Sequence, residues 1–162
     1  MVDRDLSDAA KVEHRIEAPP EAVWAILADG WTYATWVVGA SRIREVDRNW
    51  PHVGSRVLHS VGLWPLLLND HTEVVSETPN RELVLAARAW PAGEAHVRIS
   101  LDPDGAGATH AVIEEVVDKG LGAALPMPAQ QLLIVPRNRE SMRRLALLAE
   151  GKHGNRADGG GS

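Results

Sequence analysis

Two adjacent carboxylates in the last predicted strand are the residues best suited to carry out chemistry. Glu114 and Glu115 lie in an apolar run, and side chains of a strand alternate between the two faces of its sheet. If Val112 and Val116 point inward, Glu114 does too, and so does His110, two residues before Val112. A carboxylate in apolar surroundings has a raised pKa and can act as a general acid or base. We therefore predict Glu114 and His110 as catalytic residues. The alternatives are that this end of the strand is solvated or that the Glu pairs with an arginine of a neighbouring strand.

Two histidines lie on apolar strand faces. His59 falls between Val57 and Val61, and His14 occupies a similar place in the first predicted strand. Each is expected to be a hydrogen-bonded histidine of the core or of a pocket wall, and His59 is a candidate ligand contact. The chain has no cysteine, no His-Glu-x-x-His pattern and no other close spacing of metal ligands. We therefore expect no metal site and no cofactor.

The longest periodic segment of the chain has a polar residue on its apolar face. Apolar residues recur over residues 126–150 with helical spacing, at Leu132, Val135, Met142, Leu145 and Ala149. Asn138 falls on this stripe between Val135 and Met142, so all three are candidate ligand contacts. The alternative is that Asn138 caps a second helical half, because Pro136 cannot donate a hydrogen bond and predicts a kink or break.

Tryptophan is the main large aromatic group, since the chain has six tryptophans, one tyrosine and no phenylalanine. Trp36, Trp64 and Trp90 are candidate walls of a ligand pocket, although core packing also explains Trp36. Trp64 lies in an apolar stretch over residues 62–68, at a break between strands where a loop is normally polar. This stretch predicts a lid over a cavity, a contact with a membrane or partner, or a dimer contact.

The elements that must position these residues follow a simple order. A strand at residues 11–17 precedes a short helix that begins near Pro20 and a second short helix or turn at residues 31–36. Six strands are then expected at residues 42–47, 55–61, 66–77, 82–90, 95–101 and 109–117. This order predicts an α+β fold, in which a curved seven-stranded antiparallel sheet wraps around the long C-terminal helix. The space between them is a natural cavity for an apolar molecule.

Composition limits the domain organisation and the partners. The 162 residues fit one domain at residues 11–150, with a flexible arm at 1–10 and a Gly-rich disordered tail at 151–162. The net charge of −5 argues against nucleic-acid binding, which normally needs a basic face. The start lacks the apolar core of a signal peptide, and no apolar stretch approaches the ~20 residues that span a membrane. We expect a cytoplasmic protein.

Several residues, taken in order, resemble the helix-grip superfamily of START, Bet v 1 and polyketide cyclase/dehydrase proteins (SRPBCC). The matching residues are Pro20, Val23 and Trp24 in the first helix, Trp36 closing the second, Val53-Gly54 before the third strand, and Asn138-Arg139-Glu140-Ser141 followed by Leu145, Leu148 and Glu150. The resemblance covers about residues 11–150 and is closest in character to small bacterial members without an assigned reaction. It implies a hydrophobic pocket for lipids or polyketides, but not one chemistry, because this fold hosts carriers, sensors and enzymes.

Three functional hypotheses follow. The first is a carrier or sensor that encloses a small hydrophobic molecule, either a lipid or polyketide-like. The second is a cyclase/dehydratase-type enzyme that uses an interior Glu and His for proton transfer. The third is a non-catalytic module that binds another protein through its helix and the Trp64 loop. A small apolar ligand is the expected partner, nucleic acid is not, and a homodimer is left open.

Overall fold

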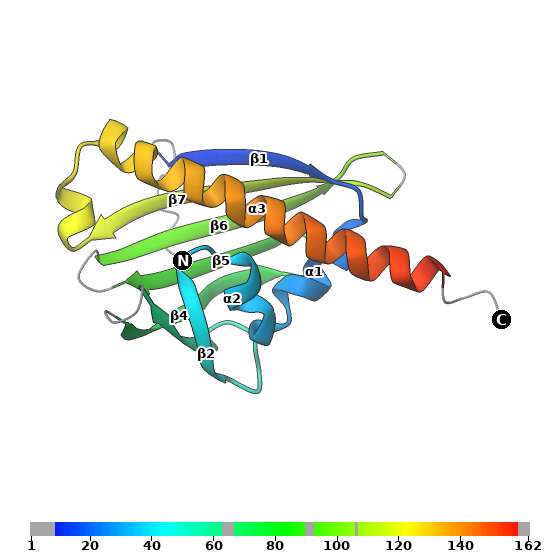
Figure 1. The fold of residues 1–162 in the computed structure, drawn as a ribbon, viewed down its shortest axis with the longest axis horizontal. Coiled ribbons are helices and arrows are strands. Elements are labelled where there is room, and N and C mark those ends of the chain that lie inside the picture. Colours follow the sequence, from blue (N-terminus) through cyan, green and yellow to red (C-terminus); the bar gives the residue numbers. More distant parts are fainter. Residues whose placement is uncertain (1–8, 63–66, 90–92, 106, 159–162) are drawn as a thin grey trace.

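The computed structural model describes residues 9–62, 67–89, 93–105 and 107–158 (Figure 1). The chain begins with strand β1 (Ala10–Ile16), helix α1 (Pro20–Leu27), the 3-10 turn η1 (Gly30–Thr32) and helix α2 (Tyr33–Trp36). The strands that follow are β2 (Ala40–Val46), β3 (Arg56–Val61), β4 (Leu68–Thr78), β5 (Glu82–Ala89), β6 (Gly93–Pro103) and β7 (Thr109–Lys119). A 3-10 turn, η2 (Leu121–Ala124), and helix α3 (Met127–Asp158) complete the described chain.

The seven strands form one antiparallel sheet in the order β1-β7-β6-β5-β4-β3-β2. Six strands follow one another as hairpin neighbours, and β1 joins the far edge by pairing with β7. Figure 1 shows α3 lying across one face of this sheet, with α1 and α2 beside it on the same side. The predicted helix-grip architecture is confirmed.

The short helices begin and end for local reasons that also position the site. Pro20 opens α1, where its missing N–H is not needed, and Val23, Ile26 and Leu27 bury the inner face. Gly30 then lets the chain pass close to the sheet, because a Cβ at this position would lie 2.6 Å from a side-chain carbon of Val46. This close approach brings α2 next to β2, and Trp36 at the end of α2 is buried.

Helix α3 is longer than the sequence predicts. It runs through Pro136 without interruption, so a break there is wrong, and the alternative of a kink stays a prediction. One lost backbone hydrogen bond is tolerated here, because Ile134 and Asn138 are buried on either side. The helix also continues through Gly151 to Asp158, so its predicted end at residue 150, before the Gly-rich tail, is wrong, while residues 159–162 lie outside the described chain. Within the described part of the chain, none of the helices combines the length and apolar character needed to cross a membrane.

The core occupies one end of the space between α3 and the sheet. Met142, Leu145 and Ala149 are fully buried there, and α3 packs mainly against β1 and α1. Burial of each large side chain contributes roughly 1.5–3 kcal/mol. Toward its beginning the same helix exposes Leu132 and Leu133, and the sheet beneath it is not filled in the same way. The unfilled end becomes the candidate site.

Candidate functional site

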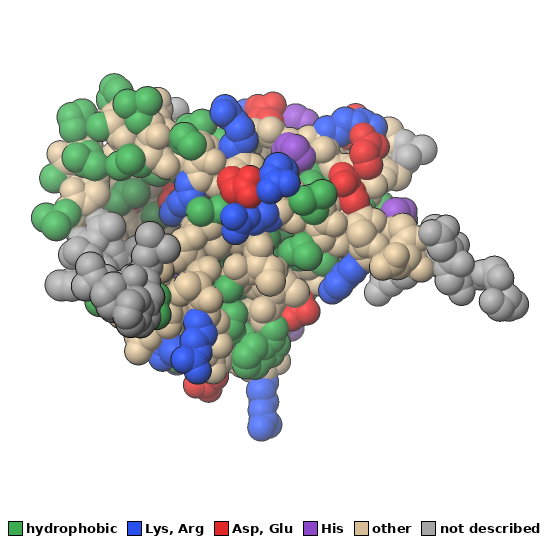
Figure 2. Space-filling view, viewed as in Figure 1, with side chains coloured by type: hydrophobic (Ala, Val, Ile, Leu, Met, Phe, Trp, Pro, Cys, Tyr) green, Lys and Arg blue, Asp and Glu red, His purple; other side chains and the backbone are tan. Residues whose placement is uncertain are grey.

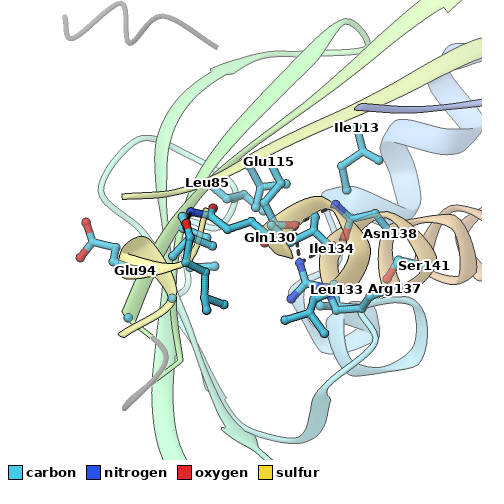
Figure 3. Close-up of a pocket in the computed structure, with 18 of the residues that line it drawn as sticks. Leu85, Glu94, Ile113, Glu115, Gln130, Leu133, Ile134, Arg137, Asn138 and Ser141 are labelled. Carbon is cyan, nitrogen blue, oxygen red and sulfur yellow. Dashed lines mark hydrogen bonds and ion pairs between the residues drawn. The ribbon is translucent and has the colours of Figure 1, made fainter. Parts of the chain in front are cut away.

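A cavity of about 480 Å³ opens between the concave face of the sheet, α2 and the first half of α3 (Figure 3). The strands contribute Leu85, Ala87, Ala95, Val97, Ile113 and Val117 to its walls. The helices and turns contribute Tyr33, Trp36, Val37, Leu121, Leu125, Leu133 and Ile134. Two of the strand positions, Ala87 and Ala95, are alanines, whose small side chains leave space above the sheet.

The inward carboxylate of β7 is Glu115, so the prediction that Glu114 faces the interior is wrong. The buried positions of β7 include Ala111, Ile113 and Glu115, which alternate with more exposed neighbours. Val112 belongs to the other face. Both faces of this strand are apolar, so its own pattern could not choose between the two registers; the choice comes from cross-strand partners, which place Ile113 between buried residues of β1 and β6.

The two residues predicted to be catalytic lie on the outer face of the sheet. Glu114 is 3.9 Å from the guanidinium of Arg98, which is one of the alternatives that the sequence left open. His110 lies 3.6 Å from Glu13 on β1. Neither side chain lines the cavity, so neither can act on a molecule inside it.

A polar cluster of three side chains is set into the apolar wall. Glu115 is 3% exposed, and its Oε2 accepts hydrogen bonds from Arg137 and, at 2.8 Å, from Nδ2 of Asn138. Arg137 also donates to Oδ1 of Asn138 at 3.2 Å. Figure 3 shows the three side chains pointing toward one another from β7 and α3. A buried carboxylate is tolerated only when it is paired and hydrogen-bonded, and this cluster provides both.

Asn138 therefore lies in the pocket wall, which agrees with its interpretation as a candidate ligand contact and not as a helix cap. Its side-chain amide bonds to Glu115 and Arg137 and caps no helical half, since α3 is continuous at this point. Whether it contacts a ligand stays a prediction. Arg137 was not predicted, because it is off the apolar stripe and reaches the cluster only through its long side chain.

The position of Asn138 in the sequence is enough to predict which side of α3 faces the cavity. Steps of three or four residues from Asn138 lead to Gln130, Ile134 and Ser141, and all of these line the cavity. The amide nitrogen of Gln130 donates to the carbonyl of Leu125 at 2.9 Å, which ties the start of α3 to the turn before it.

Ser141 closes the other end of the cavity-facing row. Its hydroxyl oxygen accepts a hydrogen bond from the backbone N–H of Val38 at 3.0 Å, which joins α3 to the segment after α2. The predicted contacts Val135 and Met142 pack against or within the core and do not line the cavity. Each follows a cavity-lining residue, Ile134 or Ser141, by one position, and so lies on a different side of the helix. The apolar stripe in the sequence did not separate the side that faces the cavity from the side that faces the core.

His59 lies one layer behind the cavity wall. Its ring stacks on Tyr33 with centroids 5.3 Å apart, and its Nε2 lies 2.9 Å from the hydroxyl of Thr72, which also bonds to the Tyr33 hydroxyl at 2.9 Å. Burial lowers the pKa of His59 to about 4, so the ring is neutral at pH 7. Burial raises the pKa of Tyr33 to about 12, so its hydroxyl keeps its proton.

The predicted tryptophan walls have different outcomes. Trp36 lines the cavity and packs edge-on against Tyr33, with ring centroids 5.6 Å apart. Trp64 and Trp90 lie outside the described residues, so their predicted contacts remain predictions.

Among the described residues, one group has the donor atoms to hold a metal ion. Glu94, His96 and Asp118 have ligand atoms within 4.8 Å of one another. Protein groups already engage them: Lys119 is 2.8 Å and Arg88 3.2 Å from Glu94, and His96 is 3.2 Å from Asp118. The arrangement is explained by ion pairing, and the expectation of no metal stays a prediction.

Comparison with known proteins identifies the family to which this chain belongs. Residues 9–150 match the family described as polyketide cyclase / dehydrase and lipid transport. The chain belongs to this family. The resemblance drawn from the sequence is thereby confirmed. No curated protein matches the sequence significantly.

Solved structures share the fold of this family member at low sequence identity. A conserved protein from Geobacillus kaustophilus is 14% identical with a TM-score of 0.68, over 88% of this chain and 95% of the other. A START superfamily protein from Mycobacterium smegmatis is 17% identical with a TM-score of 0.63, over 91% and 97%. The di-domain ARO/CYC StfQ from the steffimycin biosynthetic pathway is 10% identical with a TM-score of 0.64, over 91% and 53%. At these identities the likeness concerns the fold alone.

Proposed function

We propose that the protein binds a small, mostly apolar molecule that carries a polar group, as a carrier or sensor. The observation that supports this most is the apolar cavity of about 480 Å³ with one buried polar cluster in its wall. Ligand sites of roughly 300–1,000 Å³ usually combine apolar walls with a few placed polar groups that fix orientation. The cavity has both features.

The polar cluster supports a ligand with an oxygen-bearing group. Both hydrogen bonds to Glu115 end on Oε2, and Arg137 uses Nη2 for both of its bonds. A guanidinium has five N–H donors, so Arg137 can still donate to a carbonyl, hydroxyl or carboxylate. A hydroxyl could also donate to the second oxygen of Glu115. The apolar part of the ligand would then lie along Leu85, Val97 and Ile113.

An enzyme of the cyclase/dehydratase type is the weaker alternative. It would need an interior Glu and His that transfer protons, and no histidine is among the described residues that line the cavity. Glu115 is held by Arg137 and Asn138, and His59 is covered by Tyr33. The arrangement favours binding over proton transfer.

A pair of substitutions on β5 tests the proposal. Ala87 lines the cavity, whereas Ala86 faces the outer side of the same strand. We expect the wild type and Ala86→Phe to bind the apolar fluorescent probe N-phenylnaphthylamine saturably. Ala87→Phe should weaken binding at least roughly tenfold, because overfilling a packed site costs about 1–3 kcal/mol. No saturable binding by the wild type, or equal binding by both variants, would argue against the cavity as the site.

A further inference from the structure

An uncharged, leucine-rich surface lies at the open end of the cavity. Residues 121–136 contain no charged side chain, and their only polar side chains are Gln130 and Gln131. The leucine surface consists of Leu121, Leu125, Leu132 and Leu133, which are 70%, 40%, 76% and 67% exposed. Figure 2 shows apolar side chains gathered over η2 and the start of α3, whereas charged side chains gather farther along the helix. Clustered exposure of this kind marks an interaction site.

The leucine surface and the cavity are continuous. Leu121, Leu125 and Leu133 line the cavity as well as facing solvent, whereas Leu132 faces solvent alone. Whatever covers the surface therefore also meets the opening of the cavity.

The charges around the surface favour an anionic lipid bilayer as the partner. Residues 119–139 contain three cations, Lys119, Arg137 and Arg139, in a chain of net charge −5. The acidic residues that flank this range are engaged elsewhere: Asp118 lies 3.2 Å from His96, and Glu140 lies 2.8 Å from both Arg143 and Arg144. Lys119 and Arg137 each have a carboxylate partner, and Arg139 is exposed without an ion pair among the described residues. Leucines beside cations suit the boundary between acyl chains and anionic headgroups.

The same features disfavour a protein partner. Two copies of this chain that met through the leucine surface would bring two copies of the exposed Arg139, which has no ion pair among the described residues, to one interface. A protein interface normally has a polar rim that forms hydrogen bonds, and residues 121–136 offer almost no exposed polar side chain. A bilayer needs no such rim, because its acyl region accepts apolar side chains directly.

We propose that the leucine surface docks onto an anionic lipid bilayer and holds the open end of the cavity against it. Docking itself requires no ligand. Its use, which is to pass an apolar molecule between bilayer and cavity without exposure to water, rests on the proposed function. The membrane contact is made by side chains at one end of the fold and requires no membrane-spanning helix.

Vesicle sedimentation of the full chain tests the docking. The protein should sediment with vesicles of phosphatidylcholine and phosphatidylglycerol, and less with phosphatidylcholine alone or at high salt. Leu132→Gln should weaken sedimentation roughly tenfold, since it removes one inserted apolar side chain. It should leave N-phenylnaphthylamine binding unchanged, because Leu132 does not line the cavity.

Leu147→Gln is the matched control. Leu147 is 56% exposed on the same helix, about 22 Å farther along its axis, so its replacement should have no effect on sedimentation. No sedimentation with either vesicle, or equal losses for both variants, would overturn the proposal. So would a concentration-dependent dimer that Leu132→Gln abolishes, because the surface would then join two copies. Failure of the wild type to bind the probe would refute the proposed function while leaving docking intact.

Discussion

Replacing Arg137 by methionine should destabilise the protein more when Glu115 is present than when it is neutralised. Glu115 is buried, and methionine leaves it with Asn138 as its hydrogen-bond partner. Removing one partner of a fully buried ion pair costs about 3–5 kcal/mol. Because the Arg137 side chain is 40% exposed, part of the pair is screened, and we expect a cost of about 1–3 kcal/mol.

The loss of stability caused by Arg137→Met should nearly vanish when Glu115 is also replaced by glutamine. Glutamine keeps the size of the side chain but carries no charge that needs a partner, so the loss of Arg137 matters little. The two substitutions should therefore be non-additive by about 1–2 kcal/mol. Urea unfolding followed by tryptophan fluorescence measures each free energy of unfolding, provided that the m-value stays constant.

Glu114→Gln supplies the matched background. Glu114 is the outer carboxylate, 3.9 Å from Arg98, and its neutralisation should leave the cost of Arg137→Met unchanged. If the cost instead fell in the Glu114→Gln background and persisted in the Glu115→Gln background, the inward assignment of Glu115 would be wrong. Additivity in both backgrounds would refute the ion pair itself.

Two further predictions concern the fold that holds the pocket. Because burial lowers the pKa of His59 from 6.5 to about 4, the unfolded chain binds the proton first; stability should be full above pH 6.5 and fall toward pH 4 by up to about 3 kcal/mol. The pH dependence of urea midpoints should flatten in His59→Gln, and an equal slope in that variant would exclude His59 as its source. Gly93→Ala should cost more than Gly39→Ala: both glycines have positive φ, but only at position 93 would a Cβ meet the backbone, 1.6 Å from the carbonyl oxygen of Lys119. Equal thermal midpoints for these two variants would contradict the clash.

The order of elements could be predicted from the sequence because the period of its apolar residues changes clearly. Alternation marks the strands, and the spacing of three and four residues around Leu145 marks α3. The start of α3 agrees with the prediction to within one residue, but its continuity and its C-terminal end could not be predicted in the same way. Pro136 and Gly151 are local signals for a break and a stop. Packing of α3 on both sides of Pro136 overrides the first signal, and the exposed Gly151 is accommodated inside the helix.

The site could be predicted only in part. Asn138 was found because it interrupts an apolar stripe, which is a signal within one helix. Glu115 was missed because its strand is apolar on both faces, and only pairing with β1 and β6 decides which carboxylate turns inward. Arg137 was missed because a long side chain can reach a site from a neighbouring position on the helix, which spacing alone does not show.

The claim that the cavity encloses an apolar molecule is tested most directly by locating a bound one. Nuclear Overhauser contacts between N-phenylnaphthylamine and assigned methyl groups would identify its position. The account predicts contacts to Leu85, Val97 and Ile113, which form the floor of the cavity. Contacts confined to solvent-facing methyl groups such as those of Leu132 and Leu147 would contradict it.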